Sequence, residues 1–112
     1  MGWMDSLRGR SNDRDGGATG AMPEARLEVW VSGRVQGVGF RWWTRGVARK
    51  NALVGFAENL SDGRVWIVAE GARSGIDALW EALNSGDTAG EVSSIEREDP
   101  EPTGEFQQFG VK

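Results

Sequence analysis

The apolar residues of this chain change period along its length, and these changes limit the possible fold more than any other feature. Between Arg26 and Gly33 every second residue is a branched aliphatic one, which is typical of a strand with one buried face. Between Ser74 and Leu83 the apolar residues recur at intervals of three and four, which is typical of a helix with one buried face. A chain of 112 residues is long enough for one domain with one core, so these strands and helices must share it.

Similar patterns predict the helices and strands in the rest of the chain. Ser74 and Asp77, three residues apart, predict a capping box at the start of the second helix. In chain order the expected elements are a strand at 26–33, a helix at 41–51, strands at 53–60 and 65–69 that form a hairpin, a helix from 74 that stops at 85–87, and strands at 92–98 and 106–111. Two helices are too few to cover both faces of such a sheet. We therefore predict an α+β fold, a ferredoxin-like α/β sandwich with an antiparallel sheet of four or five strands and both helices on one face.

The first 22 residues differ from the rest of the chain. They are rich in Gly, Asp, Arg and Ser and show no periodic apolar pattern, so we expect residues 1–22 to be a disordered extension and residues 23–112 to form the domain. The N-terminus carries no hydrophobic signal segment, and no apolar run is long enough to cross a membrane. We expect a cytoplasmic protein that does not associate with membranes, and we expect it to be a monomer.

The absence of cysteine and histidine narrows the chemistry. It excludes disulfides, thiol nucleophiles, Ser-His-Asp triads, and zinc or haem sites that need thiolate or imidazole ligands. Carboxylates, hydroxyls, arginines, amides and the backbone remain as the functional groups of any active site.

Charge is distributed unevenly along the chain. The 17 acidic and 13 basic residues give a net charge of −4, which disfavours general nucleic-acid binding, and we expect no nucleic-acid partner. Despite this negative net charge, one stretch of the chain has a local excess of positive charge. The stretch between Glu28 and Glu58 contains no acidic residue and five basic ones, Arg34, Arg41, Arg45, Arg49 and Lys50. This pattern is typical either of a local site for a small anion or of a solvated basic helix face.

A glycine-rich segment, Val-Ser-Gly-Arg-Val-Gln-Gly-Val-Gly-Phe-Arg over residues 31–41, joins the first strand to the first helix. Its glycines allow a tight turn in which several N–H groups point toward one spot, and the helix N-terminus adds free N–H groups and a partial positive charge. Together they can bind a phosphate, and the guanidinium of Arg41 at the mouth of this loop can bind two phosphate oxygens. A plain turn is the other interpretation, because the segment matches neither the dinucleotide-binding nor the Walker pattern.

A second segment, Gly-Phe-Ala-Glu-Asn over residues 55–59, ends the second strand beside the turn at residues 61–63. An asparagine in this place commonly caps local backbone groups. Its carboxamide can also donate and accept hydrogen bonds at once, so Asn59 could instead hold a water molecule for attack on phosphorus.

These segments resemble the two signatures of the acylphosphatase family. The first runs Val31-x-Gly33-x-Val35-Gln36-Gly37-Val38-x-Phe40-Arg41, and the second runs Gly55-Phe56-Ala57-x-Asn59 with Gly63, Val65 and Gly71. The resemblance extends from about Arg26 to Lys112. It implies a hydrolase that splits the carboxyl–phosphate anhydride bond of small acyl phosphates into a carboxylate and inorganic phosphate, with no metal and no other cofactor.

The resemblance also implies the roles of individual residues. Arg41 is expected to be the catalytic arginine that binds phosphate, and Asn59 is expected to orient the attacking water. Glu58 departs from the family pattern, in which this position is basic or neutral, but strand alternation places it on the face opposite Asn59. The loop that is expected to supply the phosphate-binding amides comprises Arg34, Val35, Gln36, Gly37, Val38, Gly39 and Phe40.

Two other functions fit parts of the sequence. A non-catalytic anion-binding or regulatory module would keep the phosphate loop without turnover. A ferredoxin-like RNA-binding module would display stacking aromatic residues on an open sheet face, and Trp30 and Trp66 are candidates for that role. The acidic balance of the chain argues against the RNA-binding alternative.

Overall fold

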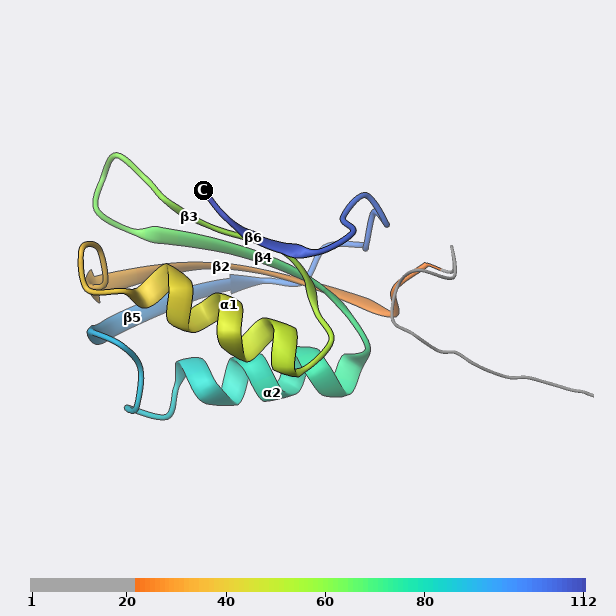
Figure 1. Cartoon of the computed structure of the whole chain (residues 1–112), viewed down its shortest axis with the longest axis horizontal. Helices are drawn as coiled ribbons and strands as arrows, with labels where there is room; N and C mark the ends of the chain where they lie inside the picture. Colours follow the sequence, from red (N-terminus) through yellow and green to blue (C-terminus); the bar gives the residue numbers. More distant parts are fainter. Residues whose placement is uncertain (1–21) are drawn as a thin grey trace, which may run out of the picture.

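The computed structural model describes residues 22–112, which form one sheet with two helices on one of its faces (Figure 1). In chain order the elements are β2 (Ala25–Arg34), α1 (Phe40–Lys50), β3 (Val54–Asn59), β4 (Val65–Gly71), α2 (Arg73–Leu83), β5 (Glu91–Glu98) and β6 (Phe109–Val111). The predicted α+β, ferredoxin-like sandwich is confirmed. The predicted extension at residues 1–22 lies outside the described residues except for Met22, so its disorder stays a prediction.

The sheet is mixed, with the strand order β5-β2-β4-β3-β6. The pairs β5–β2, β2–β4 and β4–β3 are antiparallel as predicted, whereas β6 runs parallel to β3. The connection before β6 explains the difference. β5 ends at the same end of the sheet at which β3 begins, and the chain crosses there to the opposite edge. A strand that enters the sheet from that end must point the same way as β3.

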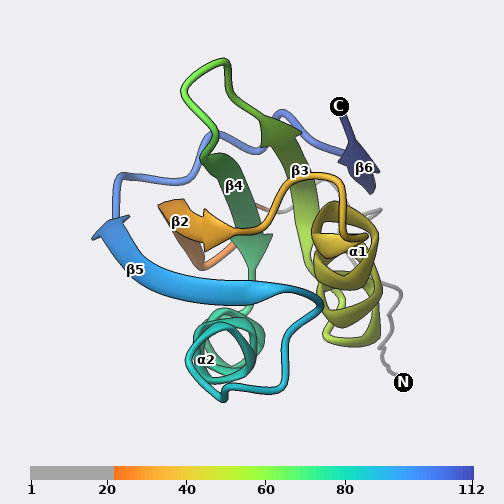
Figure 2. The same cartoon turned by 90° about the vertical axis from the view of Figure 1, so that its left-hand side faces the viewer.

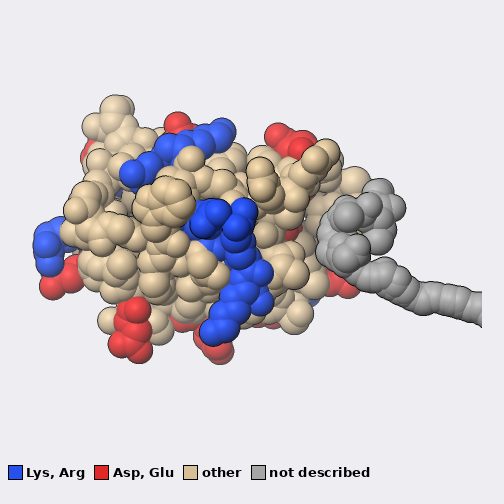
Figure 3. All heavy atoms as spheres, viewed as in Figure 1, with Lys and Arg blue, Asp and Glu red and all other residues tan. Residues whose placement is uncertain are grey.

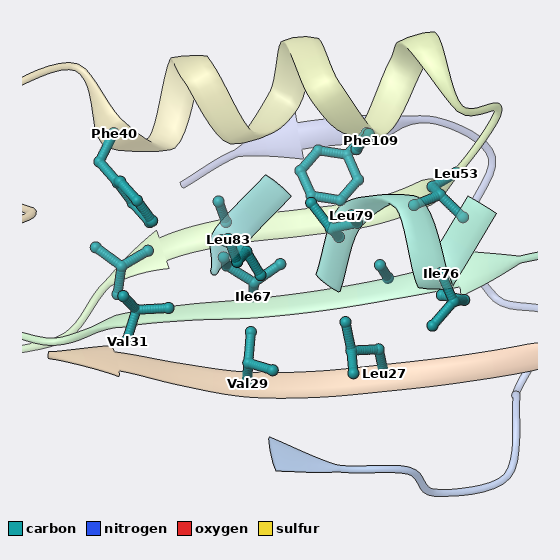
Figure 4. Packing of buried hydrophobic residues seen from close by; sticks show 14 of the residues in the cluster. Leu27, Val29, Val31, Phe40, Leu53, Ile67, Ile76, Leu79, Leu83 and Phe109 are labelled. Atoms are coloured by element: carbon teal, nitrogen blue, oxygen red, sulfur yellow. The ribbon is translucent and has the colours of Figure 1, made fainter. Parts of the chain in front are cut away.

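The core lies between the sheet and the two helices (Figure 4). Leu27, Val29 and Val31 point from β2 into this core and are fully buried, which confirms the alternation seen in the sequence. Burial of such a side chain stabilises a fold by about 1.5–3 kcal/mol, so the core holds both helices firmly against the sheet. The buried apolar residues of the helices are Phe40, Ala48, Ile76, Leu79 and Leu83.

The other, open face of the sheet carries a group of aromatic side chains. Trp30 and Trp66 stack with ring centroids 6.3 Å apart, and Phe56 meets Trp66 edge-on at 5.0 Å. Phe106 joins the group against Phe56, with centroids 5.8 Å apart. Because Phe106 belongs to the loop that reaches these rings, β6 begins at Phe109 and not at the predicted residue 106.

The start of α2 also differs from the prediction. The helix begins at Arg73 and has no side-chain cap from its own sequence, so the capping box predicted from Ser74 and Asp77 is wrong. The carboxylate of Glu24 accepts a hydrogen bond from the N–H of Arg73 at 2.8 Å instead. This partner lies 49 residues away along the chain, where a local pattern does not reveal it.

Gly55 permits a close approach between β3 and β4. Its φ is 139°, and a Cβ atom at this position would lie 1.9 Å from the carbonyl oxygen of Val68. No other residue fits there unless one of the strands moves. Gly110 in the neighbouring strand β6 contrasts with it, because no atom lies within 4 Å of the place that its Cβ would occupy.

Glu70 is a buried carboxylate that ties the loop before β6 to the sheet. It accepts hydrogen bonds from Nη1 of Arg26 at 2.7 Å, from the N–H of Thr103 at 2.8 Å and from the N–H of Gly104 at 3.0 Å. Burial raises the pKa of Glu70, but the donors outweigh it, and the pKa lies below its ordinary value. The charged form of Glu70 therefore stabilises the folded chain.

Gly55→Ala is expected to lower the free energy of unfolding by about 3 kcal/mol or more, because it combines backbone strain with a clash against main-chain atoms. Gly110→Ala is the matched control, for which we expect a change within about 1 kcal/mol. Urea unfolding followed by tryptophan fluorescence measures both values. Equal stabilities of the two variants would contradict the close approach at Gly55.

Glu70→Gln is expected to lower the free energy of unfolding at neutral pH by about 2 kcal/mol or more, because Arg26 loses its buried partner. A carboxyl group whose folded-state pKa is lowered stabilises the fold above the unfolded-state pKa, near 4.5, and this contribution is lost as the pH falls through the folded-state value. The difference between wild type and variant should therefore shrink as the pH falls below about 4.5. Urea titrations over a pH series measure this difference, and a constant difference would argue against a charged Glu70.

Candidate active site

Three segments that are far apart in the sequence meet at one end of the sheet (Figures 1 and 2). They are the loop from β2 to α1, the turn from β3 to β4, and the residue that follows β6. The register of the strands explains this meeting, since Val31 of β2 pairs with Val65 of β4, and Val65 pairs with Asn59 of β3. The loop after β2 and the end of β3 therefore leave the sheet at the same level.

The loop from β2 to α1 turns on two glycines. Gly37 and Gly39 have φ values of 76° and 84°, in the left-handed region that other residues rarely adopt. The side chains of Val35 before them and Phe40 after them are each 1% exposed and belong to the core. Apolar anchors thus hold both ends of the loop, while its glycines lie on the surface.

The main-chain N–H groups of this loop are donors without acceptors. Among residues 22–112, no atom accepts a hydrogen bond from the N–H groups of residues 36–42, which we call the amide nest. The nest includes the first turn of α1, and Gly39 caps this helix without a side-chain hydrogen bond. Free N–H groups at a helix N-terminus and in a left-handed glycine turn attract anions such as phosphate. The predicted phosphate loop therefore has the backbone chemistry that its role requires.

Arg41 lies in the first turn of α1, within the amide nest. Its Nη1 atom donates a hydrogen bond to the main-chain oxygen of Lys112 at 2.5 Å. The N–H of Lys112 in turn donates to the carbonyl oxygen of Ala57 at 2.8 Å, which fixes this part of the chain to β3. The guanidinium of Arg41 is thereby held near the end of β3. Among the described residues its other N–H groups meet no acceptor, so they can bind an anion.

Asn59 is the last residue of β3, and its side chain lies on the same face of the strand as that of Ala57, which is buried beneath the helices. It therefore lies on the side of the sheet that carries α1 and Arg41. Its Oδ1 atom is buried and accepts no hydrogen bond from the residues that the structure describes. Such an orphaned acceptor is unfavourable by about 1–3 kcal/mol and is rare in folded proteins. It is the expected place for a donor from outside the protein.

Asp62, rather than Asn59, closes the turn between β3 and β4. Its Oδ1 accepts a hydrogen bond from the N–H of Arg64 at 3.0 Å, and its Oδ2 accepts one from Nε of Arg64 at 2.8 Å. The main-chain hydrogen bond from Arg64 is the main cause that holds the pKa of Asp62 below its ordinary value. The turn-forming interpretation of Asn59 thus loses its support, and its carboxamide oxygen is left for a ligand.

Gln36 connects the loop to this turn, a contact that the sequence did not predict. Its Nε2 atom donates to the main-chain oxygen of Leu60 at 2.8 Å and to that of Arg64 at 3.0 Å. The sequence marks Gln36 only as a member of the phosphate loop. Its two acceptors lie 24 and 28 residues further along the chain, beyond the reach of any local pattern.

Basic side chains gather over α1, as the uneven charge of the sequence predicts (Figure 3). Arg45 lies over the ring of Trp42, 5.2 Å from its centroid, and belongs to the helix surface. Arg34, which was predicted as part of the phosphate loop, is the last residue of β2 and pairs with Glu91 of β5. Its exposed side chain lies 3.8 Å from the carboxylate of Glu91, so its guanidinium is associated with the edge strand.

The aromatic residues of the open face have charged residues of both signs beside them. Trp30 and Trp66 stack on each other, and they pair across adjacent strands with Glu96 and Glu58 respectively. Carboxylates thus lie on both sides of the stacked rings, whereas Lys112 lies over the ring of Phe56, with its Nζ 3.9 Å from the centroid. The same register places Glu58 on the face opposite Asn59, as expected from the sequence.

Comparisons with known proteins agree with this arrangement. The family model described as Acylphosphatase matches residues 27–111. The chain belongs to the acylphosphatase family. An acylphosphatase of Mycolicibacterium smegmatis is 50% identical over 89 residues, which are 80% of this chain and 91% of the relative. The crystal structure of acylphosphatase from Bacillus subtilis matches with a TM-score of 0.73 at 31% identity and covers 79% of this chain and 98% of that one. An acylphosphatase structure from Coxiella burnetii matches with a TM-score of 0.73 at 36% identity and covers 80% and 94%.

As an acylphosphatase the protein is a hydrolase of a family that acts on small acyl phosphates. Within residues 22–112 no helix has the length and apolar character to span a membrane. In the same part of the chain, acidic side chains do not come together in groups of three or more that could bind a metal ion.

Gly39→Ala is expected to destabilise this acylphosphatase by about 1–2 kcal/mol, because the strain is confined to a left-handed φ and no atom blocks the new Cβ. Relief of this strain would turn loop amides away, so the affinity for inorganic phosphate should fall by about tenfold, the equivalent of one hydrogen bond to a charged group. Gly46→Ala, in the middle of α1 and also without close contacts, is the control and should stabilise the helix by about 0.5–1 kcal/mol. Isothermal titration with phosphate measures both affinities, and equal values would argue against the amide nest.

Proposed function

We propose that the protein hydrolyses the carboxyl–phosphate anhydride bond of small acyl phosphates at a site formed by the amide nest, Arg41 and Asn59. The products are a carboxylate and inorganic phosphate. The observation that carries this proposal is the buried, partnerless Oδ1 of Asn59 at the end of the sheet where the N–H groups of the nest also lack partners. Donors without acceptors and an acceptor without a donor match a bound phosphoryl group with a water molecule beside it.

The amide nest and Arg41 bind the phosphoryl group. The N–H groups of the amide nest, residues 36–42, donate to the phosphoryl oxygens. The sequence-based prediction placed these donors at residues 34–40. The guanidinium of Arg41, held by Lys112, bridges two of these oxygens. Because these donors are fixed before the substrate binds, they stabilise the charge of the transition state without rearrangement.

Asn59 orients the water molecule that attacks phosphorus. Its Oδ1 accepts one hydrogen bond from the water, which directs a lone pair of the water oxygen toward the phosphorus atom, opposite the leaving carboxylate. The water oxygen forms the new bond, the carboxylate leaves with the electron pair of the broken P–O bond, and the water proton passes to a phosphoryl oxygen. Positioning of this kind lowers a barrier by about 7–11 kcal/mol.

The leaving group sets the range of substrates. A carboxylate is a stable anion and leaves without help from a general acid. The alkoxide of a phosphate monoester needs such an acid, and the proposed site of backbone amides, one guanidinium and one carboxamide includes no carboxyl, imidazole or thiol group that could act as one. We therefore expect acyl phosphates to be hydrolysed in strong preference to monoesters.

One copy of the chain is sufficient for this chemistry. The nest, Arg41 and Asn59 all come from the same chain, so we infer that the enzyme acts as a monomer. The compartment expected from the sequence, the cytoplasm, is part of the same proposal.

The purified protein is expected to hydrolyse benzoyl phosphate in the presence of EDTA. Asn59→Ala should lower kcat by about 10²-fold or more while inorganic phosphate still inhibits, because water orientation is lost and the nest stays intact. Arg41→Ala should lower kcat by about 10³-fold and should also weaken inhibition by phosphate. Steady-state kinetics with phosphate as a competitive inhibitor measure both effects.

Asn84→Ala and Arg45→Ala are the matched controls. Asn84 is an exposed asparagine at the end of α2, and Arg45 follows Arg41 by one turn of the same helix. Both control variants should retain wild-type kinetics. Normal turnover by Asn59→Ala would contradict the mechanism, and a wild-type protein that binds phosphate without turnover would favour the non-catalytic module.

A further inference from the structure

The side chain of Gln36 bridges the two segments that carry the proposed catalytic groups. Its Nε2 atom donates one hydrogen bond to the main-chain oxygen of Leu60 and a second to that of Arg64, at 2.8 and 3.0 Å. Both N–H bonds of this carboxamide are therefore used, and the side chain is partly buried. A glutamine held in this way has one fixed conformation.

The two acceptors belong to a turn that is already closed without Gln36. The main-chain oxygen of Leu60 also accepts the N–H of Gly63 at 3.2 Å, and that of Arg64 also accepts the N–H of Leu60 at 2.8 Å. Loss of the Gln36 side chain would leave neither carbonyl group without a donor. The turn therefore forms without the hydrogen bonds from Gln36. Their effect is to connect the loop from β2 to α1 with this turn.

That connection fixes the middle of the loop. Val35 and Phe40 anchor the two ends of the loop through their buried side chains. In the middle of the loop Val38 packs against the core but is only half-buried, Gln36 has no apolar side chain, and there is open space around Gly37. The main chain of Gln36 lies in the amide nest, while its side chain reaches the residue directly after Asn59. The bridge thus joins the nest to the end of β3 through one side chain.

We propose that Gln36 is a positioning residue that holds the amide nest at the distance from Asn59 which in-line attack requires. This inference rests on the proposed function. Binding of phosphate depends on the nest and Arg41, whereas alignment of the water with the bound phosphoryl group depends on the bridge as well. Since a displacement of about 1 Å between reacting groups can lower a rate by about 10²-fold, loss of the bridge should affect kcat far more than phosphate affinity.

Gln36→Met tests this division, because it keeps the length of the side chain and removes both donors. With the full chain and benzoyl phosphate, its kcat is expected to fall by about tenfold to a hundredfold. The competitive inhibition constant of inorganic phosphate should stay close to the wild-type value. Gln107→Met is the matched control, since Gln107 is exposed and its side chain makes no hydrogen bond with the described residues, and it should behave as wild type.

Gln36→Glu provides a second, independent variant. It keeps the shape of the side chain but turns an acceptor toward two carbonyl oxygens, so kcat should fall at least as far as in Gln36→Met while phosphate still binds. Thermal unfolding midpoints near that of wild type are expected for both variants. A wild-type kcat in both, or a loss of phosphate affinity as large as the loss of kcat, would overturn the inference. An inactive wild-type protein would overturn the proposed function itself, so the two failures are distinguishable.

Discussion

The pairing of β4 with both β2 and β3 is the constraint on which the rest of the structure depends. Val31, Val65 and Asn59 form one row across the three strands, and the groups of the active site are placed relative to this row. A slip of one residue in either pair would turn Asn59 onto the open face of the sheet. Gly55 helps to fix the register, because the backbone of β4 approaches it so closely that a Cβ would clash. The close packing of β3 and β4 at Gly55 thus decides on which face of the sheet the carboxamide of Asn59 lies.

The proposed chemistry needs few side chains because the backbone supplies much of the electrostatic stabilisation. The first turn of α1 and the glycine turn before it present N–H groups that no other part of the described chain uses. One guanidinium completes this set of donors, and the contact with Lys112 keeps it in place. A good leaving group makes a general acid unnecessary, so a chain without histidine can carry out the reaction. Backbone donors need only the right turn geometry. The sequence therefore marks them by glycines, which permit that geometry.

The sequence predicts local features of this protein well, and it fails where a feature depends on distant contacts. Apolar periodicity was sufficient to assign both helices and the core face of β2, and the glycines were sufficient to predict the loop before Arg41. The parallel direction of β6 depends on where β5 ends, and the cap of α2 comes from Glu24, 49 residues away. The bridge from Gln36 likewise spans 24 residues. The proposed roles of Arg41 and Asn59 come from a family resemblance, because the residues alone left a plain turn as an alternative.

Two buried side-chain atoms in the described part of the chain lack a hydrogen-bond partner, and their surroundings give them different meanings. Nε1 of Trp66 lies among the aromatic rings of the open face, where Phe56 meets the indole edge-on. Oδ1 of Asn59 lies instead on the helix side, at the end of the sheet where the amide nest is also unpaired. An isolated orphaned atom is therefore weak evidence of a site, whereas unpaired groups of opposite polarity that face one region are strong evidence. A buried group of this kind, such as Oδ1 of Asn59, is unfavourable by about 1–3 kcal/mol, and a protein tolerates it only where the surrounding structure over-determines the fold. Here the core beneath α1 provides that support. In the proposed mechanism the groups stay unpaired for a reason, because groups already paired within the protein would have to be released before a substrate could bind to them.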